Sequence, residues 1–546
     1  MANDKLRKDR IVSLHSGANT RLGAHLVSET SAVDMENLIV NRLGKRTRRD
    51  GCRAFGGQHS DAPGGLEGYI DASANRRVAA IWGNSLYKTS GGGEWTQIAS
   101  GASLASAKLH QFADGFQGGN QAMFIATCDN TAVADRTKLT AYDITSDTDT
   151  TSTLSPNTIE YFQGRLWAGE GDTLWWSELL DGMSYSAANT ILVDPAHGGR
   201  MTRIMKARGA ADRLWLFKEK SIQLFIPAWS GSNTDGTPGA ADSLDTINSQ
   251  LRVLTDGVGC LATRSAIWVP AEQGADVYFL SHDGIRSMAR AEQDVEGGAG
   301  PALSDDIPDW IARINFEVAS KAVAAYYDDA YHLAVAMDGA VINTHILRYA
   351  PATKSWSLIK LGAMDLKEHD LALTQDDLWM QSNIPGNDSS VTGVPTDDPY
   401  QVYRVYDGDL DPAAERVVWN EVSRAFIFDE PVARKRWHKA TFMFSSPETS
   451  YVEVKTRVDF GDWDTTATFY IPAAQNAIVL GQDALTWESS SDVIRRKDVS
   501  LRDVTPGYNL QVQMTNGTTQ SDTGAMTCWL TEIQAEIQED EFLYDD

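Results

Sequence analysis

Short strand-like runs that come in pairs constrain the fold of this chain more than any other feature of its sequence. The runs are rich in Val, Ile, Trp, Tyr and Phe and are separated by Gly, Asp and Asn, which is typical of strands joined by turns. Tight polar connections lie at 170–172, 218–220 and 282–284, the last with an Asp-Gly pair that suits a hairpin. An isolated hairpin is barely stable in water, so these units must pack on one another. The runs expected as strands are Arg77–Trp82, Ser85–Thr89, Ala122–Thr127, Arg165–Gly169, Thr173–Glu178, Arg213–Phe217, Ser221–Ile226, Ala266–Pro270, Asp276–Ser281 and Tyr331–Ala336.

The paired runs recur from about Gly57 to Pro431. Their spacing is irregular but fits propeller blades of ~40–45 residues, which allows about seven or eight blades. Two polar segments rich in Gly and Pro, Ser230–Gln250 and Ile384–Pro399, are too long for simple hairpins. The sequence therefore predicts a β-propeller over residues 57–431 with long loop insertions.

One segment within this region, Leu86–Ile98, resembles the Asp-box hairpin of sialidase-type propellers. Its Ser and Trp stand near the expected places, but no Asp occupies the turn. The resemblance favours a propeller hairpin and implies no sialidase chemistry.

The pattern changes after Pro431, where about six alternating strand-like runs follow one another. In one of them Tyr508, Leu510, Val512 and Met514 alternate, which predicts a strand with one buried face. A set of this size over residues 432–537 is typical of a β-sandwich, and the acidic residues 538–546 are expected to be a mobile tail.

Helix signals are few. Asp306–Ala319 is predicted to be helical, with Asp306 as N-cap, Pro308 near the first position and an apolar stripe on one face. The segment Ala32–Leu43 has no clean stripe and stays open.

Charge is distributed unevenly along the 546 residues. The net charge is −26, whereas residues 1–53 hold eleven Lys/Arg against six Asp/Glu. An acidic body does not favour tight DNA binding by phosphate neutralisation, and a basic N-terminal arm, residues 1–56, is expected to dock on something acidic. There is no run of 18 apolar residues and no apolar region in the N-terminal residues, so neither a membrane span nor a signal peptide is expected.

No sequence motif for catalysis or cofactor binding stands out. HExxH, GxSxG, GxxxxGKS/T and a Rossmann-type GxGxxG are absent, the ten His are scattered, and the four Cys lie far apart without a CxxC pair. The strand tryptophans are expected to pack between blades rather than form a sugar platform. The acids Asp407, Asp409, Asp411 and Glu415 could offer oxygens to Ca²⁺ but lack EF-hand order. The sequence therefore predicts a protein that is not an enzyme and has no cofactor and no metal.

Three passages resemble the tail hub or nozzle proteins of short-tailed bacteriophages. The first, Val33–Gly56, has an Asn-rich segment that leads into Gly, basic residues and Gly before an aromatic; Asp50-Gly51 stands where the family usually has Pro-Gly. The second, Ile159–Ser186, has the Gly-Arg-Leu-aromatic run. The third joins Asp212–Phe225 to a later Phe-Leu-Ser-x-Asp-Gly hairpin within Gly257–Met288.

This resemblance implies a structural virion protein of the tail, a β-propeller subunit in a ring of six below the portal and its adaptor. Such a ring retains packaged DNA and conducts it during ejection without binding it specifically, and it contacts distal fibre or needle proteins. The basic residues expected to meet a partner are Arg42, Lys45, Arg46, Arg48 and Arg49. Loops that face the lumen are expected to be net acidic, and one of the two long loops to narrow the bore. A receptor-binding or glycan-degrading propeller tail protein stays open as the alternative.

Overall fold

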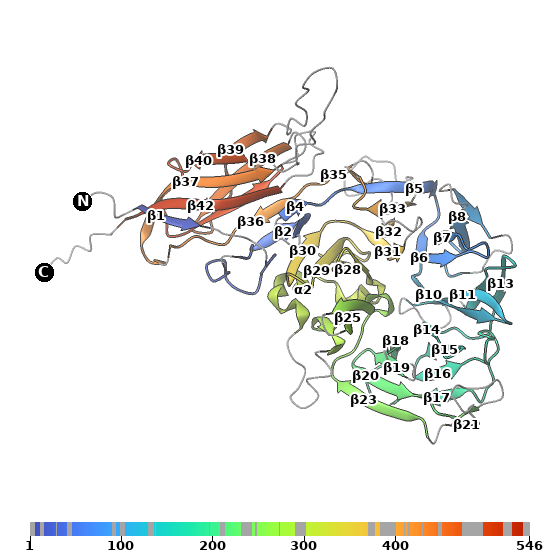
Figure 1. The fold of residues 1–546 in the computed structure, drawn as a ribbon. Helices are drawn as coiled ribbons and strands as arrows, with labels where there is room; N and C mark the ends of the chain where they lie inside the picture. The colour runs from blue at the N-terminus through green and yellow to red at the C-terminus, as the bar shows by residue number, and fades with distance from the viewer. Residues whose placement is uncertain are drawn as a thin grey trace, which may run out of the picture.

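The computed structural model shows two β-rich bodies side by side, a ring of radial sheets and a sandwich that carries both chain ends (Figure 1). Nearly all of the assigned elements are strands, as the sequence predicted. The residues that the structure describes are 6–10, 16–28, 30–40, 46–89, 94–98, 104–128, 136, 138–195, 197–207, 213–230, 243–245, 248–271, 274–289, 302–369, 377–382, 400–408, 410–412, 415–428, 430–445, 450–471, 495–516 and 527–538.

The ring is a β-propeller, and its described residues form seven blades. Each blade is an antiparallel sheet whose first strand lies nearest the axis. The first four blades follow one another along the chain. They are β6 (Pro63–Ile70), β7 (Arg76–Trp82), β8 (Ser85–Thr89) and β9 (Trp95–Gln97); β10 (His110–Gln117), β11 (Asn120–Thr127), β12 (Thr140–Asp143) and β13 (Thr148–Thr151); β14 (Thr158–Phe162), β15 (Arg165–Glu170), β16 (Thr173–Trp176) and β17 (Thr190–Leu192); and β18 (Met201–Lys206), β19 (Leu214–Lys218), β20 (Ser221–Ile226) and β23 (Gln250–Asp256).

The last three blades complete the circle and differ at their outer edges. The described part of the fifth has three strands, and its edge strand β26 meets the 3-10 turn η4 (Leu303–Asp306), where Ile285 N–H donates to Ser304 Oγ at 3.0 Å. The seventh takes its outer strand from the N-terminal part of the chain, so the two ends of the propeller close the ring by hydrogen bonds. The strands are β24 (Ile267–Ala271), β25 (Gly274–Ser281) and β26 (Gly284–Ser287); β27 (Val323–Tyr327), β28 (Ala330–Val335), β29 (His345–Ala350) and β30 (Ser355–Ile359); and β31 (Ala363–His369), β32 (Asp377–Ser382), β33 (Tyr400–Val405) and β5 (Cys52–His59).

The burial of each strand follows its place in the blade. All of β28 is buried, as are the last six residues of β11, because neighbouring blades cover both faces of a middle strand. Such strands are continuous apolar runs, which is why the sequence shows them clearly. Outer strands such as β13 and β23 are largely exposed. The three predicted hairpin turns are confirmed at 170–172, 218–220 and 282–284.

The sandwich is joined to the propeller by a continuous sheet. Strand β2 (Asp34–Glu36) pairs with β30 on the outer edge of the sixth blade and with β36 (Asn420–Val422) of the sandwich. The result is one nine-stranded sheet, β27-β28-β29-β30-β2-β36-β41-β38-β39. The second sheet of the sandwich has the order β1-β42-β37-β40. The remaining strands of both sheets are β1 (Leu6–Arg10), β37 (Arg434–Ser445), β38 (Ser450–Val458), β39 (Asp464–Ile471), β40 (Arg495–Ser500), β41 (Leu510–Thr515) and β42 (Thr527–Gln538).

The expectation of a separate N-terminal arm over residues 1–56 is wrong for the described part of that segment. Strand β1 pairs with β42, β2 bridges the two bodies, and β5 belongs to the seventh blade. Between them β3 (Leu38–Val40) pairs with β4 (Arg46–Arg48), so the open segment 32–43 contains two strands in its described part. Backbone pairing with distant strands holds this basic segment against the body.

Two local predictions are also corrected. In place of a helix over Asp306–Ala319 the chain forms η4, the short helix α2 (Pro308–Ala312) and the 3-10 turn η5 (Phe316–Lys321). Pro308 begins α2, but Ile307 rather than Asp306 occupies the cap position. In the sandwich, Leu510, Val512 and Met514 are buried as predicted, whereas Tyr508 is 46% exposed because β41 begins after it. Small pairs at Trp229–Ser230 with Ser243–Leu244 (β21, β22) and at Leu410–Asp411 with Glu415–Arg416 (β34, β35) complete the fold.

Candidate functional site

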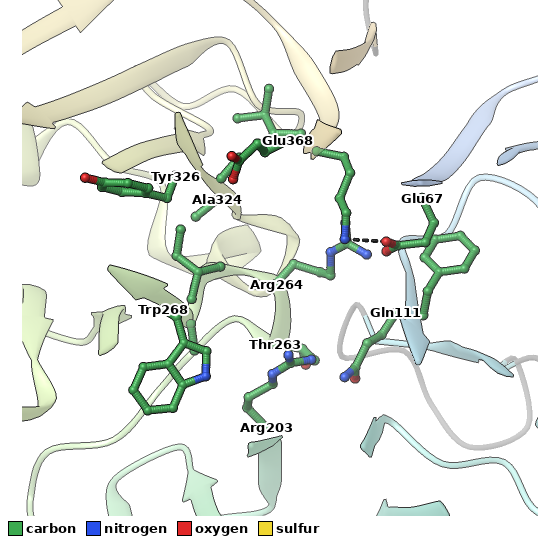
Figure 2. Close-up of a pocket in the computed structure, with 15 residues that line it drawn as sticks. Glu67, Gln111, Arg203, Thr263, Arg264, Trp268, Ala324, Tyr326 and Glu368 are labelled. Atoms are coloured by element: carbon green, nitrogen blue, oxygen red, sulfur yellow. Dashed lines mark ion pairs between the residues drawn. The ribbon is translucent and has the colours of Figure 1, made fainter. Parts of the chain in front are cut away.

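The candidate site is a cavity of about 250 Å³ on the axis of the propeller. Its walls come from the inner strands of the blades, which bring residues far apart in the sequence to one place (Figure 2). A second hollow continues from it and shares Glu67, Phe112 and Lys367. Because every blade contributes its first strand to the axis, the fold itself produces this convergence.

A short turn lies across the axis and forms one end of the cavity. The turn η2 (Thr263–Ser265) precedes the fifth blade but bonds to several others. Thr263 Oγ1 donates to the carbonyl oxygens of Thr202 at 2.6 Å and Cys128 at 3.3 Å, and Arg264 Nη1 donates to the His110 carbonyl at 3.2 Å. We call residues 263–265 the axial plug. It anchors the ring internally and closes the axis at this level.

Glutamine side chains tie neighbouring blades together in the wall. Gln111 Nε2 donates to the Ile159 carbonyl at 2.5 Å, and the Ile159 N–H donates back to Gln111 Oε1 at 3.1 Å. Gln381 does the same between the seventh and first blades, from Nε2 to the Ile81 carbonyl and from the Gly65 N–H to Oε1, both at 2.9 Å. These buried amides are satisfied by the scaffold, so they hold the wall in place.

Arg264 of the axial plug is fully neutralised. Its Nη2 lies 2.6 and 2.7 Å from the two carboxylate oxygens of Asp365, which also accepts the backbone N–H groups of Leu66 and Leu366. Burial alone would lower the pKa of Arg264, but the Asp365 carboxylate outweighs it and the pKa is raised. Burial raises the pKa of Asp365 to about 6 despite this partner. The pair is a buried structural tie between the plug and the seventh blade.

Acidic and basic groups alternate farther along the inner strands. Lys367 pairs with Glu67, and Glu160 lies 3.7 Å from Lys206 Nζ. Burial raises the pKa of Asp114 to about 6, and the nearby Glu67 carboxylate adds to this rise. The cavity therefore presents both signs of charge to whatever enters it.

Arg203 on β18 is the least compensated cation in the wall. Its Nη2 lies 4.0 Å from Glu160, a carboxylate that also serves Lys206. Its Nε is buried and has no hydrogen-bond partner within the described residues. Burial lowers the pKa of Arg203, the Glu160 carboxylate opposes this only in part, and the Arg264 charge lowers it further. Figure 2 shows the Arg203 guanidinium beside Thr263, directed toward the middle of the site.

The dimensions and donors of the cavity define what it can hold. About 250 Å³ is below the usual range of drug-sized pockets, roughly 300–1,000 Å³, so one small molecule fits and a nucleic-acid duplex does not.

In the described part of the chain no three His, Cys, Asp or Glu side chains come together as a metal site. The described helices likewise include none that is long and apolar enough to cross a membrane.

The basic residues expected to meet a partner lie elsewhere, at the junction of propeller and sandwich. Arg46, Arg48 and Arg49 are 2%, 3% and 1% exposed. Arg46 pairs with Glu421, and Arg49 lies 2.7 and 2.5 Å from the two carboxylate oxygens of Asp411. The side chains of these three residues are therefore buried away from a docking partner, which corrects the expectation, and the charges of Arg46 and Arg49 are neutralised inside the chain. Arg42 and Lys45 lie outside the described residues.

Two of the acids considered as Ca²⁺ ligands also form ion pairs. Asp411 is occupied by Arg49, and Asp407 lies 2.8 Å from Arg404 Nη2. Asp409 lies outside the described residues, as do all of Ile384–Pro399 and most of Ser230–Gln250. Asp407 and Asp411 thus serve ion pairs within the chain.

Several histidines, cysteines and strand tryptophans of the described residues are packed inside the fold. His110 and His332 are fully buried, and Cys128 and Cys260 are buried free thiols. Among the strand tryptophans, Trp82 and Trp167 are fully buried, whereas Trp175, Trp215 and Trp268 are half-buried. The rings of Trp215 and Trp268 pack at 5.3 Å between blades four and five, and Trp268 also lines the axial cavity.

Sequence reasoning missed the axial residues Glu67, Asp114, Arg203 and Arg264. Each stands singly in its own strand or turn, tens of residues from the next, so no local motif marks them. One pattern in the sequence could have indicated them. Charged residues stand inside otherwise apolar first strands, as in Met201–Lys206 (MTRIMK). Because burying an unpaired charge is costly, such residues are expected to face the shared axis of the propeller.

Comparisons with known proteins add little to this description. No family model and no curated protein matches the chain. Similar solved structures include YCF48 from Cyanidioschyzon merolae (8% identity, 65% of this chain and 98% of that one, TM-score 0.35) and a chain of the Mitotic Checkpoint Complex (8%, 69% and 91%, 0.33). An exo-beta-1,3-galactanase from Phanerochaete chrysosporium also matches (10%, 89% and 100%, 0.23). At such scores the fold assignment rests on the strand order alone.

Proposed function

We propose that this chain is a structural subunit of the tail of a short-tailed bacteriophage, a nozzle or hub that forms a ring below the portal adaptor. The proposal starts from the three resembling passages of the sequence. It includes a homo-oligomer, six subunits in the family, with the adaptor on one side and fibre or needle proteins on the other. The chain would act in the virion without catalysis.

The observation that carries the proposal is the nine-stranded sheet that runs from the sixth blade into the sandwich. A tail ring that retains packaged DNA must resist pressure without bending between its domains. Domains joined by a linker move relative to one another by default, whereas a hydrogen-bonded sheet with a shared apolar core does not. Trp356 of the propeller and Trp419 and Trp437 of the sandwich side belong to one buried cluster.

The axial plug decides the route of DNA in this proposal. The propeller axis is crossed by Thr263 and Arg264 and leaves room for a small molecule only. DNA would therefore pass between subunits, through the bore of the ring, and not through any single propeller.

The test is a phage in which this gene carries an early stop codon, complemented with wild-type chain or with variants. We expect particles made without the chain to lose DNA or tail parts, and mass spectrometry of complete virions to find the chain. Intact infectious virions that lack the chain would overturn the proposal.

One observation favours the alternative of a receptor-binding or glycan-degrading propeller. The second hollow, which continues from the axial cavity, gathers three carboxylates, Glu67, Glu160 and Asp114, and the pKa of Asp114 is raised to about 6. Polysaccharide cleavage by the purified chain, abolished in Asp114→Asn and retained in Asp338→Asn, would establish this alternative. Our proposal predicts no turnover in either.

A further inference from the structure

We propose that the axial cavity binds a small organic monocarboxylate that carries hydroxyl groups, of the size of one sugar acid, with its carboxylate on Arg203. This inference goes beyond the structural role and does not depend on it. It rests on an incompletely neutralised cation, a matching wall and a closed floor.

The charge of Arg203 is only partly compensated within the chain. Arg203 and Lys206 share the Glu160 carboxylate at 4.0 and 3.7 Å, while Arg264 nearby is saturated by Asp365. The Nε of Arg203 lacks a hydrogen-bond partner among the described residues. Guanidinium groups form their strongest bonds with planar oxyanions such as carboxylates. An incoming carboxylate on the Arg203 guanidinium would therefore compensate the charge for which Arg203 and Lys206 have only Glu160 between them.

The other walls limit the kind of anion. Glu368 lines the cavity beside Glu67, which is paired with Lys367, and the Glu368 carboxylate would repel a dianion such as phosphate more than a monoanion. The same carboxylates accept hydrogen bonds from hydroxyl groups. A monocarboxylate with hydroxyl groups meets both requirements. Its single negative charge would pair with Arg203, and its hydroxyl groups would donate hydrogen bonds to the glutamate carboxylates of the wall.

An apolar face completes the site. Trp268, Ile267 and Leu366 line the same cavity, and Trp215 backs the Trp268 ring at 5.3 Å. A rigid aromatic face of this kind packs against the C–H side of a sugar ring. Since the axial plug closes the floor, the ligand enters from one end, and a sugar acid within a longer glycan must be its terminal residue.

The experiment is isothermal titration calorimetry of the full chain with glucuronate, glucose, inorganic phosphate and acetate. We expect glucuronate to bind most tightly, because glucose lacks the charge, phosphate has the wrong charge and acetate lacks the ring. Arg203→Gln should weaken glucuronate about tenfold to a hundredfold, the loss of a charge-assisted hydrogen bond, and Arg203→Lys should restore part of it. Thermal melting confirms that each variant is folded.

Arg77→Gln is the matched control, since Arg77 is a partly buried arginine paired with Asp71 at 3.0 Å outside the cavity. It should bind glucuronate as the wild type does. No heat with glucuronate, equal affinity for phosphate, or equal weakening in the control would overturn the inference. Free glucuronate and an oligosaccharide that ends in glucuronate distinguish the source: binding of both indicates a glycan terminus, and binding of the free acid alone a soluble metabolite.

Discussion

Two groups of buried arginines, at the junction and on the axis, show how one chain uses the same side chain for different ends. At the junction Arg49 has a bidentate carboxylate partner in Asp411, and the Asp411 charge outweighs burial so that the Arg49 pKa is raised. On the axis Arg203 has a shared partner at 4.0 Å, and burial lowers its pKa. Arg49 is fully buried and Arg203 is half-buried, and only Arg49 has its charge fully paired.

This difference distinguishes an arginine whose charge is fully paired within the chain from one whose charge could still pair with a ligand. A buried ion pair that satisfies itself fixes two elements together, and removing one partner leaves a costly unpaired charge. A cation that remains undercompensated beside a cavity costs stability and is retained where it has a ligand. The predictions below test this contrast, from the largest expected effect to the smallest.

The largest effect is expected at the junction. Glu421→Gln keeps the shape of a fully buried side chain but leaves Arg46 without its carboxylate. We expect a loss of about 3–5 kcal/mol in the free energy of unfolding, measured by urea denaturation with tryptophan fluorescence. Asp338→Asn breaks the exposed pair with Arg313 and should cost at most about 1 kcal/mol. Equal losses in the two variants would contradict the structural role of the junction pair.

The next effect is pH-dependent and belongs to the Arg264–Asp365 tie. Asp365 is fully buried, and its pKa is about 6 in the folded state against 3.8 for an ordinary Asp. The folded chain thus holds the proton more tightly, so this group's contribution is greatest below about pH 4 and is lost as pH rises through 6. The pKa difference corresponds to a loss of up to about 3 kcal/mol between these limits.

Asp365→Asn should remove that dependence while adding a constant cost for the stranded Arg264. The measurement is the difference in unfolding free energy between wild type and variant at several values from pH 4 to 7. If the unfolding free energies of wild type and variant changed with pH in parallel over this range, the pKa of Asp365 would not be raised in the folded chain.

A smaller effect is expected at Gly51, where the sequence departs from the resembling family. A Cβ there would lie 2.3 Å from the Leu410 carbonyl oxygen, and that backbone cannot move easily beside the Arg49–Asp411 pair. Gly51→Ala should therefore cost about 1–3 kcal/mol by overpacking. Gly57→Ala, where nothing lies within 4 Å, is the matched control, and equal stability of the two variants would refute the close approach.

The smallest change in stability is expected at Arg203 itself. Arg203→Gln removes an undercompensated charge, so the unfolding midpoint should change by less than the equivalent of about 1 kcal/mol, in either direction. Thermal melts of the two variants, Arg203→Gln and Glu421→Gln, give the contrast between the two regions directly. A large loss at Arg203 would place it with the structural pairs.

Most of the fold could be predicted from the sequence, because the strands of a propeller blade are apolar runs that follow one another closely along the chain. Runs such as Arg77–Trp82 and Ser221–Ile226 appear as strands because blades cover both of their faces. The long-range pairings could not be predicted: β5 in the seventh blade, β1 beside β42, and β2 between the two bodies depend on partners more than 300 residues away. That is why the N-terminal segment looked like an arm.

The site was hidden for the same reason. Basic residues at 46–49 looked available because their partners, Glu421 and Asp411, lie far along the chain. Arg203 and Glu67 looked unremarkable because only closure of the ring brings them to one cavity. The charge content predicted a basic segment correctly, but not that Arg46 and Arg49 form ion pairs inside the chain.

The measurement that tests the central proposal most directly is the mass of the assembled species, by mass photometry of tail particles or of the chain purified with its adaptor. A ring subunit predicts a discrete species at six times 59.8 kDa, with adaptor mass in addition where it is bound. A chain that stays monomeric both alone and within the particle would contradict the account.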